Sequence, residues 1–550
     1  MIKKRLLRIK NNFRELGIDG YIVPKNDEFF SEYSQKDRLK FISNFSGSAG
    51  CAIILKNKNY LFIDGRYTIQ AQIESKKNFS IVDYHKIIDC KLFKNLTLGV
   101  DPKLITSTKI KMFFNKYNKI KIIEHNLIDK IFKKKSIPSK PFFSLNLNAA
   151  GESCEAKINR TVNFLKKNKS DYIFISAPEN VAWLLNIRGF DCPNSPIPNC
   201  HLLLDTKKNF WLIGEKNKFK QLLKDKKIYT HQIINPKSFE KFIVKKEKKQ
   251  IIIDHKTCSL FYERILREKF NIKKIEDPIY LMKSIKNKVE IRNTIESHIA
   301  DGIALTKFLY WIKKVNKKKI TEFDAQNKLE KFRKENQNYL YPSFNTIAGS
   351  GKNGAIVHYR ADKKSSKIIK KNDIFLCDSG GQYKYGTTDV TRTICFQNQK
   401  KNIKDIFTKV LRGHIAVANN NFDRNKYGKL IDFHARKFLK KINLDYSHGT
   451  GHGVGYFLNV HEGPQSISKY NNIKLSEGMI LSNEPGYYKK GHFGIRIENL
   501  IFIKKTKNKL FFENLTLAPI DKDLIDFKQL NVTERNYLFQ YHLTVYQKLA

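Results

Sequence analysis

Acidic and imidazole side chains recur in four glycine-rich segments of the last third of the chain, and this recurrence constrains the fold more than any other feature of the sequence. The segments are residues 375–393, 448–464, 482–488 and 494–499. The first holds Asp378 and Asp389 around a turn rich in glycine and tyrosine, with apolar runs outside, which predicts a β-hairpin that brings the two carboxylates together. Glu484 and Glu498 flank a second polar turn and are expected to converge in the same way.

The charge of such a set requires cations. Taken singly, Asp378, Asp389, His452, Glu484 and Glu498 are ordinary turn or strand-end residues, and a lone histidine is more often structural than a ligand. Four carboxylates gathered in one place carry about −4, which is prohibitive unless cations balance the charge. Two divalent ions would cancel it. Mostly oxygen ligands, one imidazole and no thiolate indicate Mn²⁺, Co²⁺, Fe²⁺ or Zn²⁺ in a two-metal hydrolase site.

Upstream of these segments the chain alternates helical and strand signals. Residues 1–152 and 153–276 show the same order of helical stretches and short apolar runs, which predicts two related α/β units. The small, polar stretch 146–153 marks the first boundary, and a third unit, residues 277–550, opens at an Asp-Pro pair. The fold class expected is therefore mixed α/β.

The third unit begins with a long helical pattern. Isoleucines recur at every fourth position from Ile291 to Ile303, and Leu309 and Ile312 continue the apolar pattern. This spacing predicts a long amphipathic helix, and we expect the isoleucines to be core residues rather than a functional site.

Composition excludes several classes of protein. Lysine and arginine number 103 against 52 acidic residues, a net charge of +51. The excess runs through every segment without a nucleic-acid-binding motif, so specific nucleic-acid binding is not expected. No stretch approaches the roughly 20 apolar residues of a membrane span, and charges at Arg8, Lys10 and Arg14 interrupt the N-terminus where a signal peptide would be apolar. The eight cysteines are scattered, which predicts free thiols and a cytoplasmic location.

Longer motifs surround the candidate ligands and extend along nearly the whole chain. They are residues 31–33, 45–50, 62–67, 180–189 and 356–359, the runs DSGGQYKYGTTDVTRT, HGTGHGVGYFLNVHEGP, NEPGYY and FGIRIEN, and residues 538–546. With these motifs the chain resembles the pita-bread metallopeptidases, and specifically the long, three-domain Xaa-Pro aminopeptidases. The resemblance implies two creatinase-like N-terminal α/β domains (1–152 and 153–276) followed by a catalytic pita-bread domain (277–550).

The resemblance also implies a ligand set. Asp378, Asp389, His452, Glu484 and Glu498 would bind two divalent ions, with manganese expected and zinc, cobalt or iron as alternatives. Asp389 and Glu498 would bridge the ions, Asp378 would bind one of them, and His452 and Glu484 the other. None of the five positions departs from the family pattern.

The same resemblance implies the reaction. A hydroxide bridging the two ions would attack the first peptide bond of a peptide with proline in the second position, and Glu484 would shuttle the proton. His358 and His461 would donate hydrogen bonds to the substrate and the tetrahedral intermediate. His448 would border the proline pocket, and Arg496 would orient ligand carboxylates. A structural role for His358 and His448 is the alternative.

Three other interpretations remain open. A prolidase that cleaves Xaa-Pro dipeptides is the nearest alternative, whereas a methionine aminopeptidase would not need the two N-terminal domains. A non-catalytic peptide or nucleic-acid binder on the same fold is the alternative from another class. The family also suggests a homodimer without membrane association.

Overall fold

The computed structural model describes residues 2–87, 93–114, 117–132, 140–315 and 319–550. The chain divides into two compact units. The first comprises Met1–Leu147 and Glu152–Ile279, and the second comprises Asn148–Gly151 and Tyr280–Ala550. The domain boundaries at residues 152 and 276 stay a prediction.

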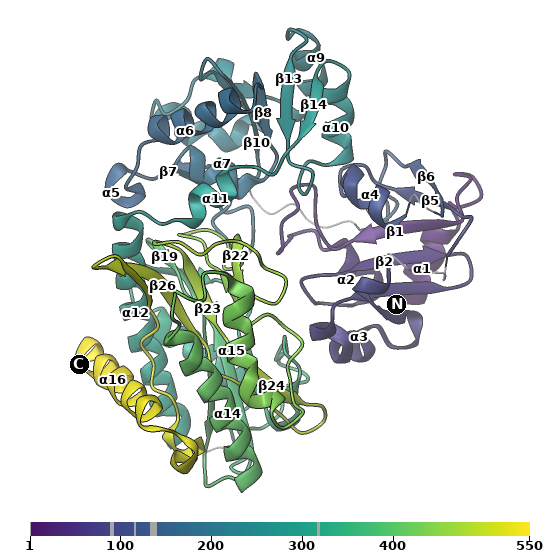
Figure 1. Ribbon diagram of the computed structural model, residues 1–550. Helices are drawn as coiled ribbons and strands as arrows, with labels where there is room; N and C mark the ends of the chain where they lie inside the picture. Colours follow the sequence, from purple (N-terminus) through teal and green to yellow (C-terminus); the bar gives the residue numbers. More distant parts are fainter. Residues whose placement is uncertain (1, 88–92, 115–116, 133–139, 316–318) are drawn as a thin grey trace. The chain divides into compact units, whose positions relative to one another are not determined.

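The first unit contains two six-stranded sheets (Figure 1). The first sheet consists, in chain order, of β1 (Gly20–Pro24), β2 (Cys51–Leu55), β3 (Asn59–Ile63), β4 (Ser80–Asp83), β5 (Thr97–Val100) and β6 (Lys119–Ile122). The second consists of β8 (Tyr172–Ile175), β10 (His201–Asp205), β11 (Phe210–Ile213), β12 (Ile233–Ile234), β13 (Gln250–Ile253) and β14 (Asn271–Lys274).

The two sheets share one topology. Their spatial orders are β4-β3-β2-β1-β5-β6 and β12-β11-β10-β8-β13-β14. In each sheet the second strand along the chain is antiparallel to both neighbours, and every other neighbouring pair is parallel. This correspondence confirms the prediction of two related α/β units.

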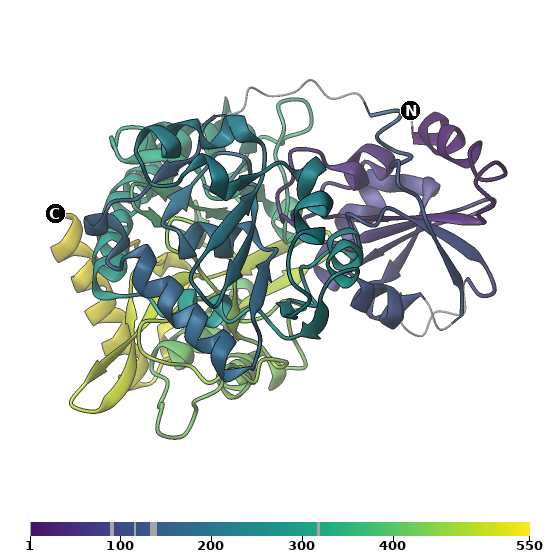
Figure 2. The same cartoon turned by 90° about the horizontal axis from the view of Figure 1, so that it is seen from above.

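Helices cover the sheets of this unit, which also contains the short pair β7 (Phe143–Ser144) and β9 (Ile187–Arg188). The helices are α1 (Ile2–Lys10), α2 (Arg38–Ser43), α3 (Thr68–Ser75), α4 (Ser107–Phe113), α6 (Cys154–Lys167), α7 (Pro178–Leu184), α8 (Lys220–Lys224), α9 (Phe239–Val244) and α10 (Leu260–Arg267). In the first sheet, Leu6, Ile42 and Ala71 of α1 to α3 join the core of one face, while Ile110 of α4 joins that of the other (Figures 1 and 2). Strands buried on both faces explain why runs such as that of β2 are apolar throughout.

The second unit contains the glycine-rich strands. They are β15 (Tyr339–Pro342), β16 (Ile347–Ser350), β17 (Ile374–Ser379), β18 (Gly381–Tyr383), β19 (Gly386–Thr387), β20 (Val390–Cys395), β21 (Gly451–Gly453), β22 (Glu462–Ile467), β23 (Ile480–Asn483), β24 (Gly486–Lys489), β25 (Phe493–Arg496), β26 (Asn499–Thr506) and β27 (Lys509–Asn514). Their sheets are β15-β18-β19, β16-β17-β20, β22-β21-β23-β26-β27 and β24-β25.

Two helix pairs cover these sheets (Figure 1). The helices that lie wholly or mostly in this unit are α5 (Leu147–Ala150), α11 (Ile279–Ser284), α12 (Lys288–Lys314), α13 (Glu322–Arg333), α14 (Lys401–Ala418), α15 (Gly428–Lys440) and α16 (Val532–Leu549). α12 and α13 pack on β16, β17 and β20, and α14 and α15 pack on the five-stranded sheet. α16 packs with α14 and β25 in a third cluster. The site described below lies among these strands.

The long helix predicted at the start of this unit is confirmed as α12, and a capping box between Asn287 and Glu290 fixes its first turn. The expectation that its isoleucines form the core is wrong in part. Ile291 and Ile295 are only half-buried, and Ile303 is exposed. A residue every four positions advances about 40° per step around a helix of 3.6 residues per turn, so the stripe winds out of the buried face.

Both predicted hairpins are present. β17 pairs with β20 in an antiparallel register that sets Asp378 opposite Thr391. The chain between them forms the short antiparallel pair β18 and β19. β24 pairs with β25, with Gly486 opposite Arg496.

The seven cysteines that the structure describes form no disulfide, while Cys90 lies outside the described residues. None of the helices in the described ranges combines the length and the apolar character needed to cross a membrane.

Candidate metal centre

Four of the five predicted ligands converge in the second unit. The Nε2 atom of His452 lies 3.3 Å from Oδ2 of Asp389 and 3.6 Å from Oε1 of Glu484. Asp389, His452 and Glu498 each offer one ligand atom, and these atoms lie within 4.8 Å of one another. Asp389 and Glu498 are buried, whereas His452 and Glu484 are half-buried, so the cluster is open on one side.

Strand pairing explains the convergence. Asp389 precedes β20, and a bridge between Thr391 and Glu498 joins β20 to the residue before β26. Glu484 follows β23, and its backbone N–H donates to the carbonyl of Thr450, 2.8 Å away, beside His452 in β21. Backbone hydrogen bonds therefore join the four strands β20, β21, β23 and β26 around the candidate ligands.

The fifth predicted ligand, Asp378, is held at the same place. Its Oδ2 accepts a hydrogen bond from the Nη2 group of Arg496. Its Oδ1 is buried and has no hydrogen-bond partner among the described residues. A buried carboxylate oxygen without a partner is costly, and a cation would satisfy it.

The orientation of His452 also fits a metal ligand. Its Nδ1–H donates to the carbonyl of Gly453 at 2.9 Å, which leaves the Nε2 lone pair facing the carboxylates. Metal-binding histidines are fixed by this kind of hydrogen bond from the second ring nitrogen. The donor set therefore fits divalent ions, as its oxygen-rich chemistry also indicates.

The carboxylates repel one another when only protein charges act. Burial first, and then the charges of Asp389, Glu484 and Asp378, hold the pKa of Glu498 well above its usual range. Burial and the charges of Asp389 and Glu484 raise the pKa of Asp378 to about 7, although Arg496 opposes the shift. Such perturbed groups are typical of functional sites.

His452 shows the opposite effect. Burial alone would lower the pKa of its imidazole, but the hydrogen bond to Asp389 and the charges of Glu484 and Asp389 raise it to about 9. A positive charge is therefore favourable at this position, as expected where carboxylates converge.

Arg496 organises several of these groups. Besides Asp378, it donates through Nε to Oγ1 of Thr391 at 3.0 Å and through Nη1 to the hydroxyl of Tyr488 at 2.6 Å. Thr391 in turn donates to Oε2 of Glu498 at 2.6 Å. Arg496 thus touches one candidate ligand directly and another through Thr391, in keeping with its predicted orienting role.

Two of the three accessory histidines lie beside the cluster. The ring of His461 stands edge-on to that of His452, with 4.3 Å between centroids. Nδ1 of His448 lies 3.9 Å from Oε2 of Glu484, and its Nε2 lies 2.9 Å from the Tyr488 hydroxyl. Burial lowers the pKa of His448 to about 4, so this imidazole is neutral near pH 7.

The third accessory histidine, His358, follows the short 3₁₀ helix η8 (Gly351–Ala355). The buried carboxylate of Glu322 fixes this loop, because it accepts from Asn353 Nδ2 at 3.0 Å and from the Tyr359 hydroxyl at 2.7 Å. The predicted contacts of all three histidines with substrate stay predictions.

Sequence reasoning missed a buried arginine behind the cluster. The guanidinium of Arg392 is 1% exposed. Its acceptors are the carbonyls of Thr391, Glu498, Ala518 and Pro519, the side-chain oxygen of Asn499 and the hydroxyl of Tyr541, all at 2.7–3.0 Å. Arg392 therefore ties β20 and the backbone of Glu498 to the C-terminal helix α16. Its place in the DVTRT run, three residues after the candidate ligand Asp389 and within a buried strand, was the available signal.

A second missed group stands next to His461. The carboxylate of Glu462 is buried and forms ion pairs with two buried lysines. Its Oε2 lies 2.8 Å from Nζ of Lys283, and its Oε1 lies 2.5 Å from Nζ of Lys286. These lysines, 176 or more residues earlier in the chain, carry no sequence signal that distinguishes them from the many surface lysines.

Comparisons with known families cover almost the whole chain. Residues 292–505 match the model of metallopeptidase family M24, and residues 508–550 match the C-terminal region of that peptidase. Residues 5–130 and 133–290 match two models of the creatinase/prolidase N-terminal domain.

Individual relatives agree with these matches. A probable Xaa-Pro aminopeptidase P of Laccaria bicolor is 36% identical, over all of this chain and 90% of its own length. Xaa-Pro aminopeptidase 1 of Dictyostelium discoideum is 36% identical, over all of this chain and 93% of its own.

A solved structure matches along the full length. The X-prolyl aminopeptidase of Caenorhabditis elegans, described as a cytosolic enzyme with a di-nuclear active site, is 28% identical, covers all of this chain and 96% of its own, and gives a TM-score of 0.92. A prolidase of Pyrococcus horikoshii is 26% identical with a TM-score of 0.54, but covers only 66% of this chain. The chain belongs to metallopeptidase family M24, among the Xaa-Pro aminopeptidases that carry two creatinase-type N-terminal domains.

Proposed function

We propose that this protein is a metal-dependent aminopeptidase that releases the N-terminal residue from peptides with proline in the second position. The observation that supports it most is that ligand atoms of Asp389, His452 and Glu498 lie within 4.8 Å of one another. Glu484 lies beside them, and so does an oxygen of Asp378 that has no hydrogen-bond partner among the described residues. The full-length relatives bear names with this activity.

Asp378, Asp389, His452, Glu484 and Glu498 would hold two divalent ions in this site. When bound, the ions supply a lowered pKa for the attacking water and polarisation of the scissile carbonyl. Asp389 and Glu498 would serve both ions, because both carboxylates are buried and each offers an oxygen within 4.8 Å of the other and of the His452 ring.

Protein side chains carry out the remaining steps, which are proton transfer and hydrogen bonding to the substrate. Glu484 is half-buried on the open side of the cluster, so a carboxylate oxygen can take the proton of the attacking water and return it to the departing imino nitrogen. His461, edge-on beside His452, can donate a hydrogen bond to the developing oxyanion. His358 is proposed for the same task, and the neutral His448 for the edge of the proline pocket.

Proline explains why a dedicated enzyme is needed. The nitrogen of an Xaa-Pro bond carries no hydrogen, and the ring restricts the residue before it. Sites that grip an extended, hydrogen-bonded substrate backbone therefore handle this bond badly, whereas a pocket shaped for the rigid ring gains from it.

Manganese is the proposed ion, since oxygen-rich ligand sets suit Mn²⁺. We also propose a homodimer in the cytoplasm. The location rests on the description of the C. elegans enzyme as cytosolic. The dimer rests on the family resemblance and is open to sedimentation analysis.

The test compares an Xaa-Pro-Xaa tripeptide, its Xaa-Ala-Xaa twin and an Xaa-Pro dipeptide, each with Mn²⁺ and after chelation. We expect metal-dependent release of the first residue from the proline tripeptide alone. Glu484→Gln should lower kcat by about 10²–10⁴-fold, the usual contribution of a general acid–base group. Glu477→Gln, a change at an exposed glutamate nearby in the sequence, is the matched control.

Each other outcome has a distinct meaning. Cleavage of the dipeptide in preference to the tripeptide would make the protein a prolidase. No cleavage by folded, metal-loaded protein would contradict the proposal and favour a non-catalytic binder on the same fold.

A further inference from the structure

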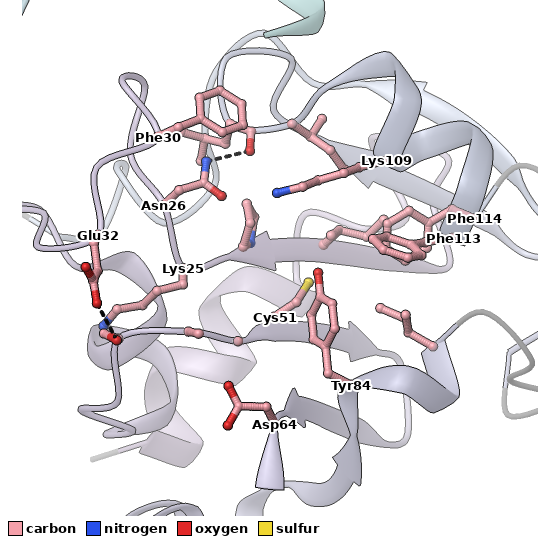
Figure 3. Close-up of a pocket in the computed structure, with 18 of the residues that line it drawn as sticks. Lys25, Asn26, Phe30, Glu32, Cys51, Asp64, Tyr84, Lys109, Phe113 and Phe114 are labelled. Carbon is pink, nitrogen blue, oxygen red and sulfur yellow. Dashed lines mark hydrogen bonds between the residues drawn. The ribbon is translucent and has the colours of Figure 1, made fainter. Parts of the chain in front are cut away.

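The first sheet holds a cavity that the proposed peptidase reaction does not use. It has a volume of about 440 Å³ and lies wholly within residues 22–114 (Figure 3). Part of its wall is formed by residues that follow parallel strands: Asn26 after β1, Asp64 after β3, Tyr84 after β4 and Leu104 after β5. The cavity thus opens at the carboxyl ends of these strands.

The topology of the sheet marks this place. From β1 the chain continues to β2 on one side, and from β5 it continues to β6 on the other side, while β1 and β5 are parallel neighbours. The carboxyl ends of two such strands form a crevice, because their connections leave in opposite directions. Ligands of open α/β sheets bind at this switch point.

One ammonium group in the cavity lacks a counter-charge. Lys109, on α4, points its amine into the cavity (Figure 3). Over the part of the chain that the structure describes, its Nζ has no hydrogen bond or ion pair, and it lies 5.7 Å from the centroid of the Phe30 ring. The other charged groups of the wall have partners: Lys25 pairs with Asp37, Asp64 with Arg66, and Glu32 with the Ser48 hydroxyl.

The remaining surface of the cavity is mainly apolar. Ile22, Ile87, Ile105, Phe113 and Phe114 contribute side chains to it. The hydroxyl of Tyr84 points into the same space as the Lys109 amine and is a second donor (Figure 3). A few convergent polar groups in a concave apolar wall are the usual form of a small-molecule site.

We propose that this cavity binds a small organic monocarboxylate with an apolar body, whose carboxylate pairs with the Lys109 ammonium and accepts from the Tyr84 hydroxyl. Among the described residues Lys109 is the cation of the wall without an ion-pair partner, and one carboxylate supplies one negative charge to it. A phosphate monoester would bring nearly two charges into a wall that already contains Asp64 and Glu32, and so fits less well. Burial lowers the pKa of the Lys109 amine, and a bound carboxylate would oppose that shift.

The test uses two probes of nearly equal shape, 4-phenylbutyrate and its neutral amide, titrated calorimetrically into the full-length, metal-loaded protein. We expect one molecule of 4-phenylbutyrate to bind per chain. The amide should bind at least about tenfold more weakly than the acid, since only the acid can form an ion pair with Lys109. Lys109→Met should lower the affinity for 4-phenylbutyrate to that of the amide. Lys111→Met removes an exposed charge from the same helix and should leave binding unchanged.

A second variant tests the volume instead of the charge. Ala49→Phe fills the cavity from its rim and should weaken both probes alike. Melting temperature and tripeptide hydrolysis, measured on every variant, verify that each one is folded.

Four results would overturn the proposal. They are no binding of 4-phenylbutyrate up to about 10 mM, equal affinity for the acid and the amide, equal effects of Lys109→Met and Lys111→Met, and an affinity for 4-phenylbutyrate that Lys109→Met leaves unchanged. The last would assign the carboxylate to another site, such as the metal centre.

Discussion

Replacing Arg496 with lysine should weaken metal binding without changing the charge of the site. The arginine donates in three directions, to Asp378, to Thr391 and to Tyr488. A lysine ammonium is a single point and can keep one of these hydrogen bonds at comparable geometry. Because the +1 charge stays, electrostatic repulsion of the incoming cations is nearly constant, and the variant isolates the positioning of the ligands.

The size of the effect follows from the hydrogen bonds that a lysine cannot make. Each hydrogen bond to a charged group contributes about 1.5–3 kcal/mol to stability, and the lysine variant loses two of the three. Either Asp378 or the Thr391–Glu498 pair then loses its hydrogen bond from residue 496. Substitution of residues that orient metal ligands usually lowers metal affinity about 10–100-fold. That range corresponds to about 1.4–2.7 kcal/mol, less than the sum for two such hydrogen bonds because the ligands can relax.

The assay is competition for Mn²⁺ between the protein and a chelating dye, with wild type, Arg496→Lys and Arg424→Lys compared. Arg424 is exposed and serves as the matched control. We expect a rise of about 10–100-fold in the dissociation constant for Arg496→Lys alone. Equal dissociation constants for wild type and Arg496→Lys, in protein with an unchanged metal-free melting curve, would refute the positioning role.

Other expected outcomes concern stability and the ions themselves. Asp301→Asn leaves the fully buried Arg333 without its carboxylate at 2.7 Å and should cost about 3–5 kcal/mol in urea unfolding; a loss below about 1 kcal/mol would contradict the pairing. Burial raises the pKa of Asp277 to about 7, so its proton is retained in the folded state and the free energy of unfolding falls as pH rises from about 4 to 7. Asp277→Asn, which can still bond Asn180, should therefore gain about 2–3 kcal/mol relative to wild type between pH 5 and 7.5, and parallel pH profiles would exclude this. Chelation should abolish hydrolysis and lower the melting temperature, and Mn²⁺ should restore both, because the ions bind only the folded chain. Full activity in chelator would rule out metal dependence.

Local sequence pattern predicts much of the site. Asp378 and Asp389 flank one hairpin, and Glu484 and Glu498 flank another, so their convergence in pairs follows from turn chemistry and strand pairing over about a dozen residues. The order of helices and strands in the first unit likewise follows from apolar runs buried on both faces.

The features that sequence does not predict depend on contacts between distant segments. The bridge from Thr391 to Glu498 and the ion pairs of Lys283 and Lys286 with Glu462 join residues more than 100 positions apart. The periodicity of apolar residues along the sequence does not indicate such pairs. A lysine that pairs with a buried carboxylate looks the same in sequence as one of the many that face solvent.

The isoleucine stripe of α12 misleads for a different reason. A repeat of four is longer than the helical turn, so it does not mark a single buried face. The deeply buried positions include Leu305 and Phe308, together with the polar Thr294 and Ser297. Burial in this helix is therefore set by what packs on it and not by where its isoleucines fall.

The buried Arg392 has a consequence for when the metal site becomes complete during synthesis of the chain. Every candidate ligand has been synthesised once the chain reaches Glu498, but four of the six acceptors of Arg392 come later, at Asn499, Ala518, Pro519 and Tyr541. Until residues 518–541 have left the ribosome and docked, the guanidinium that donates to the backbone of Glu498 lacks the carbonyls of Ala518 and Pro519 and the hydroxyl of Tyr541. Full metal affinity is therefore expected only after α16 has docked, and a chain truncated before Tyr541 is expected to bind Mn²⁺ more weakly than the chain that contains it.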